Sequence, residues 1–253
     1  MNLEQVLEYI GNDDSIARNI THWEKIPPKE AVYRDLPQYI DGKIKSALNR
    51  KGIYYLYSHQ ADAISEVSKG KNIVVVTPTA SGKTMCYNIP VVDAIIKNEE
   101  ARALFIFPTK ALAQDQLAEL HELIEGAAVQ IKTYTYDGDT PQSARKAIRQ
   151  AGHIVVTNPD MLHSGILPHH TKWTKLFENL EFVVIDEIHY YRGVFGSHMA
   201  NVIRRLKRIC DFYGSNPQFI CCSATIANPG ELAAKIIGSE VTVIDDNGAP
   251  SGG

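Results

Sequence analysis

The sequence is poor in cysteine, with four in 253 residues. They are Cys86, Cys210, Cys221 and Cys222. None belongs to a C-x-x-C pair, and three of the four lie within apolar stretches. Unpaired thiols of this kind are typical of a reducing compartment and lack the spacing of a zinc site. The sequence therefore predicts reduced core thiols in a cytoplasmic protein.

Long apolar runs are also missing, so no stretch of the sequence is expected to span a bilayer. The first residues, MNLEQVLEYIGNDDS, have no basic region followed by an apolar core, which argues against a secretory signal. Excess positive charge is absent as well, since the net charge is −3. That value disfavours a generally basic nucleic-acid coat but leaves room for a local basic groove. Together these absences favour a soluble globular protein without a membrane partner.

What the sequence does contain, from about residue 53, is a rhythm of short apolar runs rich in β-branched residues. The runs are 72–77, 103–107, 131–135, 153–157, 181–186, 218–223 and 241–244. Helical patterns with one apolar face separate many of them, most clearly over 110–125 and 198–213. This alternation predicts an α/β fold, a doubly wound and mainly parallel sheet flanked by helices. Ligands of such sheets bind beyond the carboxyl ends of the strands.

The ends of the chain differ from this central pattern. Residues 1–50 are polar and charged, and they predict a small, mostly helical N-terminal accessory segment with short helices at about 3–10 and 39–50. Residues 51–245 form the predicted main domain. The Gly/Pro-rich tail 246–253 is interpreted as a truncated linker.

The segment TPTASGKT (77–84) follows one predicted strand and opens a helical stretch. In a strand–loop–helix context, successive backbone N–H groups and the helix N-terminus point at phosphates. Lys83 would reach the β- and γ-phosphates, and the hydroxyl of Thr84 would ligate Mg²⁺. The predicted nucleotide-binding residues of the loop are Thr79, Ala80, Ser81, Gly82, Lys83 and Thr84. A chance G-K-T in an ordinary turn is the alternative, and the strand before the loop argues against it.

Two further segments follow predicted strands. Asp186 and Glu187 begin D-E-I-H after the run ending at Ile185. The first carboxylate can hold a metal, and the second can orient and deprotonate an attacking water. The segment Ser223-Ala224-Thr225 follows the next strand and has little meaning alone. Its order after the other two segments gives it weight.

TPTASGKT, DEIH and SAT in this order resemble motifs I, II and III of superfamily 2 helicases of the DEAD/DEAH-box type, in their first RecA-like domain. Segment 108–116 resembles motif Ia, 157–160 resembles motif Ib, and His59-Gln60 resembles the motif that reads adenine. LYSHQADAI, YDGDTP, TNPDMLH and DEIHYYRGVFGSHMANVIRRLKR narrow the resemblance to DNA repair helicases of the MrfA (YprA-like) type, bacterial relatives of the Hrq-type, RecQ-related helicases. Loops of this superfamily commonly open with alanine or threonine, which fits Thr77.

The resemblance implies roles for individual residues around ATP and Mg²⁺. Gln60 would contact the adenine edge, and Tyr57 would stack on the base, with Tyr54 and Tyr55 as rival candidates and core packing as the plain alternative. Lys83, Asp186 and Glu187 would be the catalytic residues, with Thr84 and Asp186 at the metal. Residues implied to couple nucleotide state to nucleic acid are His189, Ser223 and Thr225, His189 also being counted with the nucleotide-binding residues.

The resemblance also implies a track for single-stranded DNA. Its residues would be Thr109, Lys110, Gln114, Gly138, Thr157, Asn158 and Asp160. Hydroxyls, amides and helix N-termini suit sequence-independent contacts to a nucleic-acid backbone. For Thr109 and Thr157, capping of a helix after a strand is an alternative that is compatible with this role.

The implied function is the ATP-binding motor half of a DNA helicase or translocase, with 3′ to 5′ polarity and a role in bacterial DNA repair at the nucleoid. The partners would be 3′-tailed single-stranded DNA, a second RecA-like domain and a C-terminal cysteine-rich domain, neither of which this sequence contains. Because the arginine finger belongs to the second domain, the chain alone is expected to hydrolyse little ATP. An RNA-remodelling ATPase and a nucleotide switch without hydrolysis are the alternatives.

Overall fold

The computed structural model describes residues 3–22 and 27–250. Contacts divide the chain into two compact units, residues 1–31 with 250–253, and Val32–Ala249. The first unit contains α1 (Leu3–Asn12) and α2 (Asp14–Ala17), whose N-cap Asp13 accepts a hydrogen bond from the Ser15 amide at 2.9 Å. The helix predicted at about 3–10 is therefore present and two residues longer.

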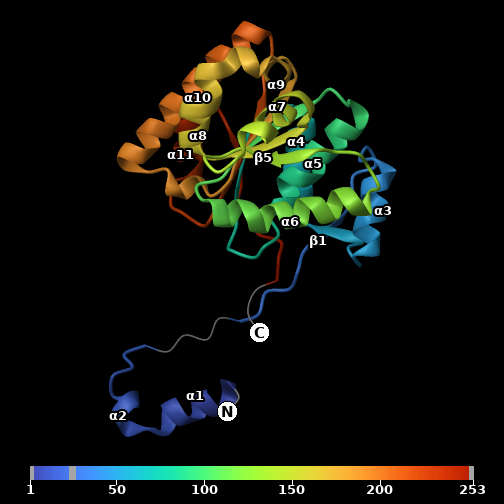
Figure 1. Cartoon of the computed structure of the whole chain (residues 1–253). Coiled ribbons are helices and arrows are strands. Elements are labelled where there is room, and N and C mark those ends of the chain that lie inside the picture. Colours follow the sequence, from blue (N-terminus) through green and yellow to red (C-terminus); the bar gives the residue numbers. More distant parts are fainter. Residues whose placement is uncertain (1–2, 23–26, 251–253) are drawn as a thin grey trace. The chain divides into compact units, whose positions relative to one another are not determined.

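The second unit is built on a seven-stranded parallel sheet (Figure 1). Its strands are β3 (Ile73–Val76), β4 (Arg102–Ile106), β5 (Thr133–Thr135), β6 (Ile154–Thr157), β7 (Leu180–Ile185), β8 (Gln218–Ser223) and β9 (Thr242–Ile244). The spatial order is β5-β6-β4-β7-β8-β3-β9, and every neighbouring pair is parallel. All seven apolar runs of the sequence form strands, and the predicted doubly wound α/β fold is confirmed.

Alternate side chains of the strands enter two cores, one on each face of the sheet. Ile73 and Val75 of β3 belong to one core, whereas Val74 and Val76 belong to the other. The first core is covered by α3 (Gly42–Arg50), α4 (Ser58–Ser68), α5 (Thr84–Lys97) and α6 (Lys110–Gly126). The opposite core is covered mainly by α7 (Gln142–Ala151), α9 (Thr174–Glu178), α10 (Gly193–Tyr213) and α11 (Pro229–Ile237). Burial of strands on both faces explains why their sequences are continuous apolar runs.

Shorter elements connect these layers. They are α8 (Pro159–Met161), the π-helical turn η1 (Leu162–Ile166), and the 3₁₀ turns η2 (Leu167–Lys172) and η3 (Ile188–Tyr190). A separate antiparallel ribbon joins β1 (Tyr33–Asp35) to β2 (Tyr55–Tyr57). All four cysteines are free and buried, as the sequence predicts. Among the described residues, no helix combines the length and the apolar character needed to cross a membrane.

The predicted helices over 110–125 and 198–213 correspond to α6 and α10, but α10 begins at Gly193, five residues earlier. The helix expected at about 39–50 begins at Gly42, capped by the Asp41 carboxylate, which accepts from the Lys43 amide at 2.7 Å. This helix packs on α6, with Ala47 against Gly126. Residues 32–50 thus lie within the compact unit, although the sequence places a division near residue 50. That division remains a prediction.

Candidate functional site

Parallel pairing gathers the chemically suggestive segments at one edge of the sheet, the carboxyl ends of the strands. β3, β8 and β7 are neighbours, so the loop 77–84, the segment 223–225 and the segment 186–189 follow adjacent strands. β4 and β6 come next in the sheet and lead into 107–114 and 157–160. The sheet therefore places the predicted phosphate and metal residues on one half of this edge and the predicted nucleic-acid residues on the other.

The loop after β3 is closed by its own hydroxyl groups. Thr77 Oγ1 and Ser81 Oγ lie 2.6 Å apart, and both side chains are buried. Ala80 and Gly82 adopt left-handed backbone conformations, with φ of 64° and 75°. The conformation of Gly82 favours glycine, and a Cβ there would lie 2.6 Å from Gln60 Nε2 and displace that side chain. Thr77 thus has a structural role at the mouth of the loop.

The two reactive side chains of the loop are bonded to the protein. Lys83 Nζ donates to the carbonyl oxygens of Thr77 at 2.8 Å and Pro78 at 3.0 Å. Thr84, the first residue of α5, donates its hydroxyl proton to Gln116 Oε1. To serve phosphate and metal, each group would exchange these bonds for contacts to the ligand.

The segment after β7 combines burial with a strained backbone. Asp186 is 5% exposed, and its Oδ1 accepts from the Glu187 amide at 2.8 Å. Burial, reinforced by the like charge of Glu187, raises the pKa of Asp186 to about 6. Glu187 has φ 50° and ψ 47°, a left-handed conformation that costs a side-chain residue about 1–3 kcal/mol and clusters at functional sites. A buried, unpaired carboxylate of this kind favours a bound cation.

His189 lies between the segments after β7 and β8. Its Nδ1 accepts from the Ala224 amide at 3.2 Å and lies 3.1 Å from Glu187 Oε2. A ring whose Nδ1 accepts from Ala224 has no proton there for Glu187, which leaves Oε2 buried and without a donor. Ser223 is fully buried and donates to the Ala224 carbonyl at 2.7 Å, whereas Thr225 is exposed. Of the two hydroxyls predicted to couple nucleotide and nucleic acid, that of Ser223 therefore has a hydrogen-bond partner among the described residues, the Ala224 carbonyl.

The residues expected to read adenine are bonded within the protein. Gln60 is 3% exposed; its Nε2 donates to Gly82 O at 2.9 Å, and its Oε1 accepts from the Tyr57 amide at 3.0 Å. Tyr57 stacks against Tyr33 at 5.5 Å and against His59 at 5.9 Å between ring centroids. In this arrangement Gln60 supports the phosphate loop, and contact with adenine would require it to exchange a bond. Tyr54 and Tyr55 are exposed, at 64% and 56%.

A pocket of about 310 Å³ brings the predicted nucleic-acid residues together. Its lining includes Thr109, Lys110, Gln114, Thr157 and Asn158. Gly138 is exposed between two further lining residues, Asp137 and Asp139, and Asp160 is exposed beyond Asn158. Lys110 Nζ pairs with Asp139 and lies 3.5 Å from Asp137 Oδ2. The cation of this pocket is therefore neutralised by the chain's own carboxylates.

Two helices begin near this pocket, and their first residues show which threonine caps a helix and which does not. Thr109 caps α6 by accepting from the Leu112 amide at 3.4 Å. After β6 the cap is Asn158, which accepts from the Met161 amide at 2.8 Å. Thr157 donates to the Tyr136 carbonyl at 2.8 Å, so the capping alternative is correct for Thr109 and wrong for Thr157. The Thr157 hydroxyl is buried and bonded within the protein.

Sequence reasoning missed the hydrogen-bond network that connects the two predicted metal ligands. Tyr87 on α5 is 1% exposed, and its hydroxyl lies 3.1 Å from Gln116 and 3.5 Å from Asp186. Gln116 also accepts from Thr84, so α6 contacts both predicted metal ligands through this network. Burial raises the pKa of Tyr87 well above its usual value, which keeps the phenol protonated as a donor. The position of Gln116 six residues after Lys110 was visible in the sequence, but its partners depend on the packing of α5 against α6.

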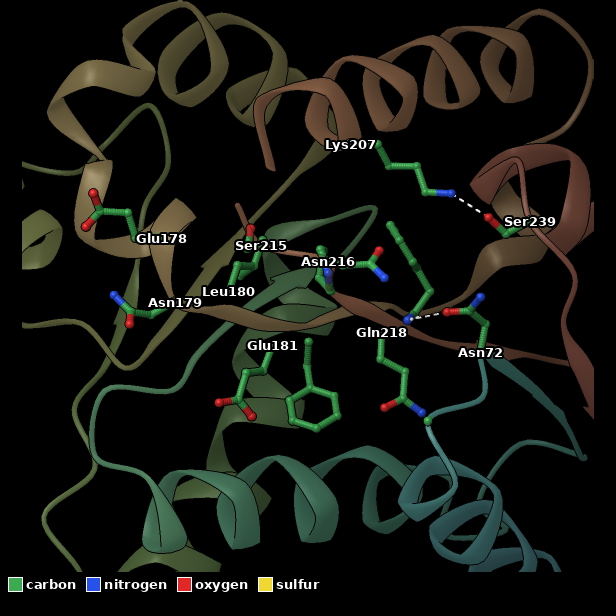
Figure 2. Close-up of a pocket in the computed structure, with 14 residues that line it drawn as sticks. Asn72, Glu178, Asn179, Leu180, Glu181, Lys207, Ser215, Asn216, Gln218 and Ser239 are labelled. Atoms are coloured by element: carbon green, nitrogen blue, oxygen red, sulfur yellow. Dashed lines mark hydrogen bonds between the residues drawn. The ribbon is translucent and has the colours of Figure 1, made fainter. Parts of the chain in front are cut away.

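A second pocket, of about 600 Å³, lies at the opposite edge of the sheet, where β7 and β8 begin (Figure 2). Several of its polar side chains form hydrogen bonds within the protein. Asn72 Oδ1 accepts from the Phe219 amide at 2.9 Å, near the start of β8, and Lys207 donates to Ser239 at 2.5 Å. Gln218 donates to the Val67 carbonyl at 3.0 Å. These contacts show that Asn72, Lys207 and Gln218 are bonded within the protein.

Comparisons with known proteins agree with this arrangement. Residues 57–232 match the family model for DEAD/DEAH box helicases. The chain is 62% identical over 234 residues to the ATP-dependent helicase YprA of Bacillus subtilis, covering 92% of this chain and 31% of that protein. It is 39% identical over 260 residues to the ATP-dependent helicase HRQ1 of Saccharomyces cerevisiae, covering 99% of this chain and 23% of that protein.

Solved structures give the same relationship. The crystal structure of the DUF1998 helicase MrfA bound to DNA and AMPPNP superimposes with a TM-score of 0.95 at 58% identity, covering all of this chain and 35% of that one. The chain thus spans about a third of the length of these relatives or less.

Proposed function

The chain belongs to the DEAD/DEAH box helicase family, and on that premise we propose that it is the ATP-binding motor domain of an ATP-dependent DNA helicase or translocase. The observation that supports this most directly is that Lys83 and Thr84 follow β3, and Asp186 and Glu187 follow β7, the two strands that flank β8. YprA and HRQ1 are named ATP-dependent helicases, and MrfA has been crystallised with DNA.

The residues present fit ATP and Mg²⁺. Gly82 and Ala80 provide a loop backbone that turns at positive φ, and the first turn of α5 follows it directly. Asp186 and Glu187 Oε2 are buried carboxylate oxygens with few donors, which suits a cation and its water shell. Thr84 and Asp186 would hold the metal, which neutralises charge on the phosphates when bound. Lys83 would bind the phosphates, and Glu187 would orient and deprotonate the attacking water.

For the polynucleotide we propose a single strand lying over Thr109, Lys110, Gln114, Gly138, Thr157, Asn158 and Asp160. The shared pocket at Thr109, Lys110, Gln114, Thr157 and Asn158 supports this track. Since the Thr157 hydroxyl donates to Tyr136, this residue would contribute by shaping the backbone there. We further propose 3′ to 5′ movement on 3′-tailed DNA, a role in DNA repair at the bacterial nucleoid, and adenine contacts from Gln60 with Tyr57.

We also propose that the whole protein adds a second RecA-like domain and a cysteine-rich domain beyond a linker that starts near residue 246. Residues 1–50 would be an accessory segment of the motor. An arginine finger from the second domain is commonly worth about 10³–10⁵ in rate. The chain by itself should therefore bind nucleotide and hydrolyse almost none.

The test compares ATPase rates of the full-length protein with single-stranded DNA and with RNA of matching sequence. Stimulation by DNA is expected, with loss of at least about 10²-fold for Glu187→Gln. Stimulation by RNA alone would support a remodelling ATPase instead. An unchanged rate in Glu187→Gln would remove this residue from catalysis, and rapid hydrolysis by the isolated chain would contradict the need for a second domain.

A further inference from the structure

The short segment 246–249, at the C-terminal end of the compact unit, is docked beside the phosphate loop. Gly248 and Ala249 are buried, Ala249 being 5% exposed. Gly248 O accepts from the Val32 amide at 2.9 Å, and Val32 O accepts from the Ser58 amide at 2.8 Å. The segment is thereby fixed to the residues that precede His59.

Gly248 has no space for a side chain. A Cβ at this position would lie 2.6 Å from Ser58 N and 3.0 Å from Val32 O, and closer still to Ser58 Oγ. Two of these three atoms belong to the backbone, so a larger residue cannot be accommodated by a change of rotamer. Position 248 therefore accommodates glycine alone in this conformation.

His59 connects this segment to the loop. Its ring is fully buried; Nδ1 accepts from the Gly248 amide at 3.2 Å, and Nε2 lies 3.1 Å from Ser81 O. The two contacts require an unprotonated Nδ1 and a protonated Nε2, which is one tautomer of the neutral ring. Burial lowers the pKa of His59 and so favours that neutral form.

The contact to Ser81 O bears on phosphate binding because of peptide geometry. The carbonyl of Ser81 and the amide of Gly82 belong to one planar trans peptide unit and point in opposite directions. His59, by holding Ser81 O, fixes where the Gly82 N–H points. Gln60 does the same for the Lys83 N–H, since it holds Gly82 O at 2.9 Å. Amides of this loop are the groups proposed above to bind phosphate.

We propose that His59 is a positioning residue that couples the docked segment 246–249 to the phosphate loop, so that nucleotide binding and docking of this segment stabilise each other. This inference rests on the proposed ATP site. The coupling is reciprocal, as any linkage between two binding equilibria must be. If segment 246–249 continues into a linker, a movement of that linker would be transmitted to the phosphate loop through the imidazole ring of His59.

The test measures two quantities on the 253-residue chain: affinity for a fluorescent ATP analogue with Mg²⁺, and hydrogen exchange of the amides of 246–249. Gly248→Ala should weaken affinity by about 5-fold or more, the lower end for coupled sites, although Gly248 belongs to none of the proposed ligand contacts. Gly42→Ala is the matched control, because nothing lies within 4 Å of a Cβ there. It should leave affinity unchanged.

Two substitutions of His59 separate its contacts. The amide of His59→Asn can replace Nδ1, so segment 246–249 should stay protected while affinity falls. The amide of His59→Gln can replace Nε2, so affinity should stay within about 2-fold of wild type while protection of the segment is lost. In the His59→Gln background, Gly248→Ala should have no further effect, a non-additivity that general destabilisation would not produce.

The wild-type chain gives an outcome that requires no substitution. Addition of the analogue should slow exchange of the Gly248 amide relative to amides of α1. Unchanged exchange, or wild-type affinity in Gly248→Ala, would overturn the coupling. A wild-type chain that binds no ATP analogue would instead contradict the proposed function itself.

Discussion

Asp186→Asn should make the metal-free chain more stable at pH 8 while abolishing the ATPase activity proposed for the full-length protein. The pKa of Asp186 rises from 3.8 to about 6 on folding, because the carboxyl is buried and lies beside Glu187. The folded chain therefore binds more protons than the unfolded chain between these values. The stability associated with a protonated Asp186 is fully present below pH 3.8 and is lost as pH rises through about 6.

The magnitude follows from the two pKa values. They differ by about two pH units, and each unit corresponds to about 1.4 kcal/mol, so the ionised carboxylate costs up to about 3 kcal/mol at pH 8. Asparagine is similar in size, and its oxygen can still accept from the Glu187 amide. Its NH₂ group can donate to the Tyr87 hydroxyl, which itself donates to Gln116. We expect a gain of about 1–3 kcal/mol, since new hydrogen bonds replace part of the old ones.

The assay is urea unfolding in a chelating buffer at pH 8 and at pH 4, with Asp115→Asn on exposed α6 surface as control. The difference between variant and wild type should be large at pH 8 and close to zero at pH 4, while the control changes little at either pH. With Mg²⁺ and an ATP analogue, wild type should become more stable than Asp186→Asn, because the wild-type carboxylate would bind the metal. Equal differences at both pH values would refute the reasoning.

Three further changes test other parts of the structure. Asp139→Asn removes a partner of Lys110 and should tighten binding of a single-stranded oligonucleotide by about 2–5-fold at low salt, measured by fluorescence anisotropy. Unchanged or weaker binding would contradict the claim that Asp139 weakens nucleic-acid binding by neutralising Lys110. Ile44→Ala opens a cavity under α3 and should cost the compact unit about 2–5 kcal/mol, against little change for exposed Asn49→Ala; a small cost would support a division near residue 50. Thr77→Val retains shape but removes the hydroxyl bonded to Ser81, and urea unfolding should show a loss of about 1–2 kcal/mol; no loss would leave Thr77 without a structural role.

The sheet was predictable because each strand is buried on both faces and so has a continuous apolar sequence. The start of α10 was not, because residues 193–197 lack an apolar stripe. Gly196, in the first turn of the helix, packs closely on the Tyr191 carbonyl, where a Cβ would lie 2.6 Å away. The β1–β2 ribbon was missed for a similar reason, since Tyr33 and Tyr55 are exposed and their short strands carry little periodic signal.

At the site, the sequence predicted which residues gather but not how they are bonded. The family resemblance implied that Gln60 contacts adenine, yet in the structure its amide supports Gly82 and caps α4. The bond between Gly248 and His59 joins residues 189 positions apart, and the pair between Lys110 and Asp139 joins the start of α6 to the loop after β5. Such contacts depend on tertiary packing, which local patterns do not encode.

The order of strands gives the site a physical route between its two halves. β7 lies between β8, on the side of the proposed nucleotide site, and β4, which leads into the proposed nucleic-acid track. The Asp186 amide donates to Ile106 O at 3.1 Å, and the Phe107 amide donates to Thr157 O at 3.1 Å. A displacement of Asp186 on metal binding would therefore pull on the ends of β4 and β6, from which the loops with Thr109 and Asn158 leave. Because Lys110 pairs with Asp139, this ion pair would have to open before Lys110 could contact a phosphate of the proposed strand, and it could open without any change in the net charge of the domain.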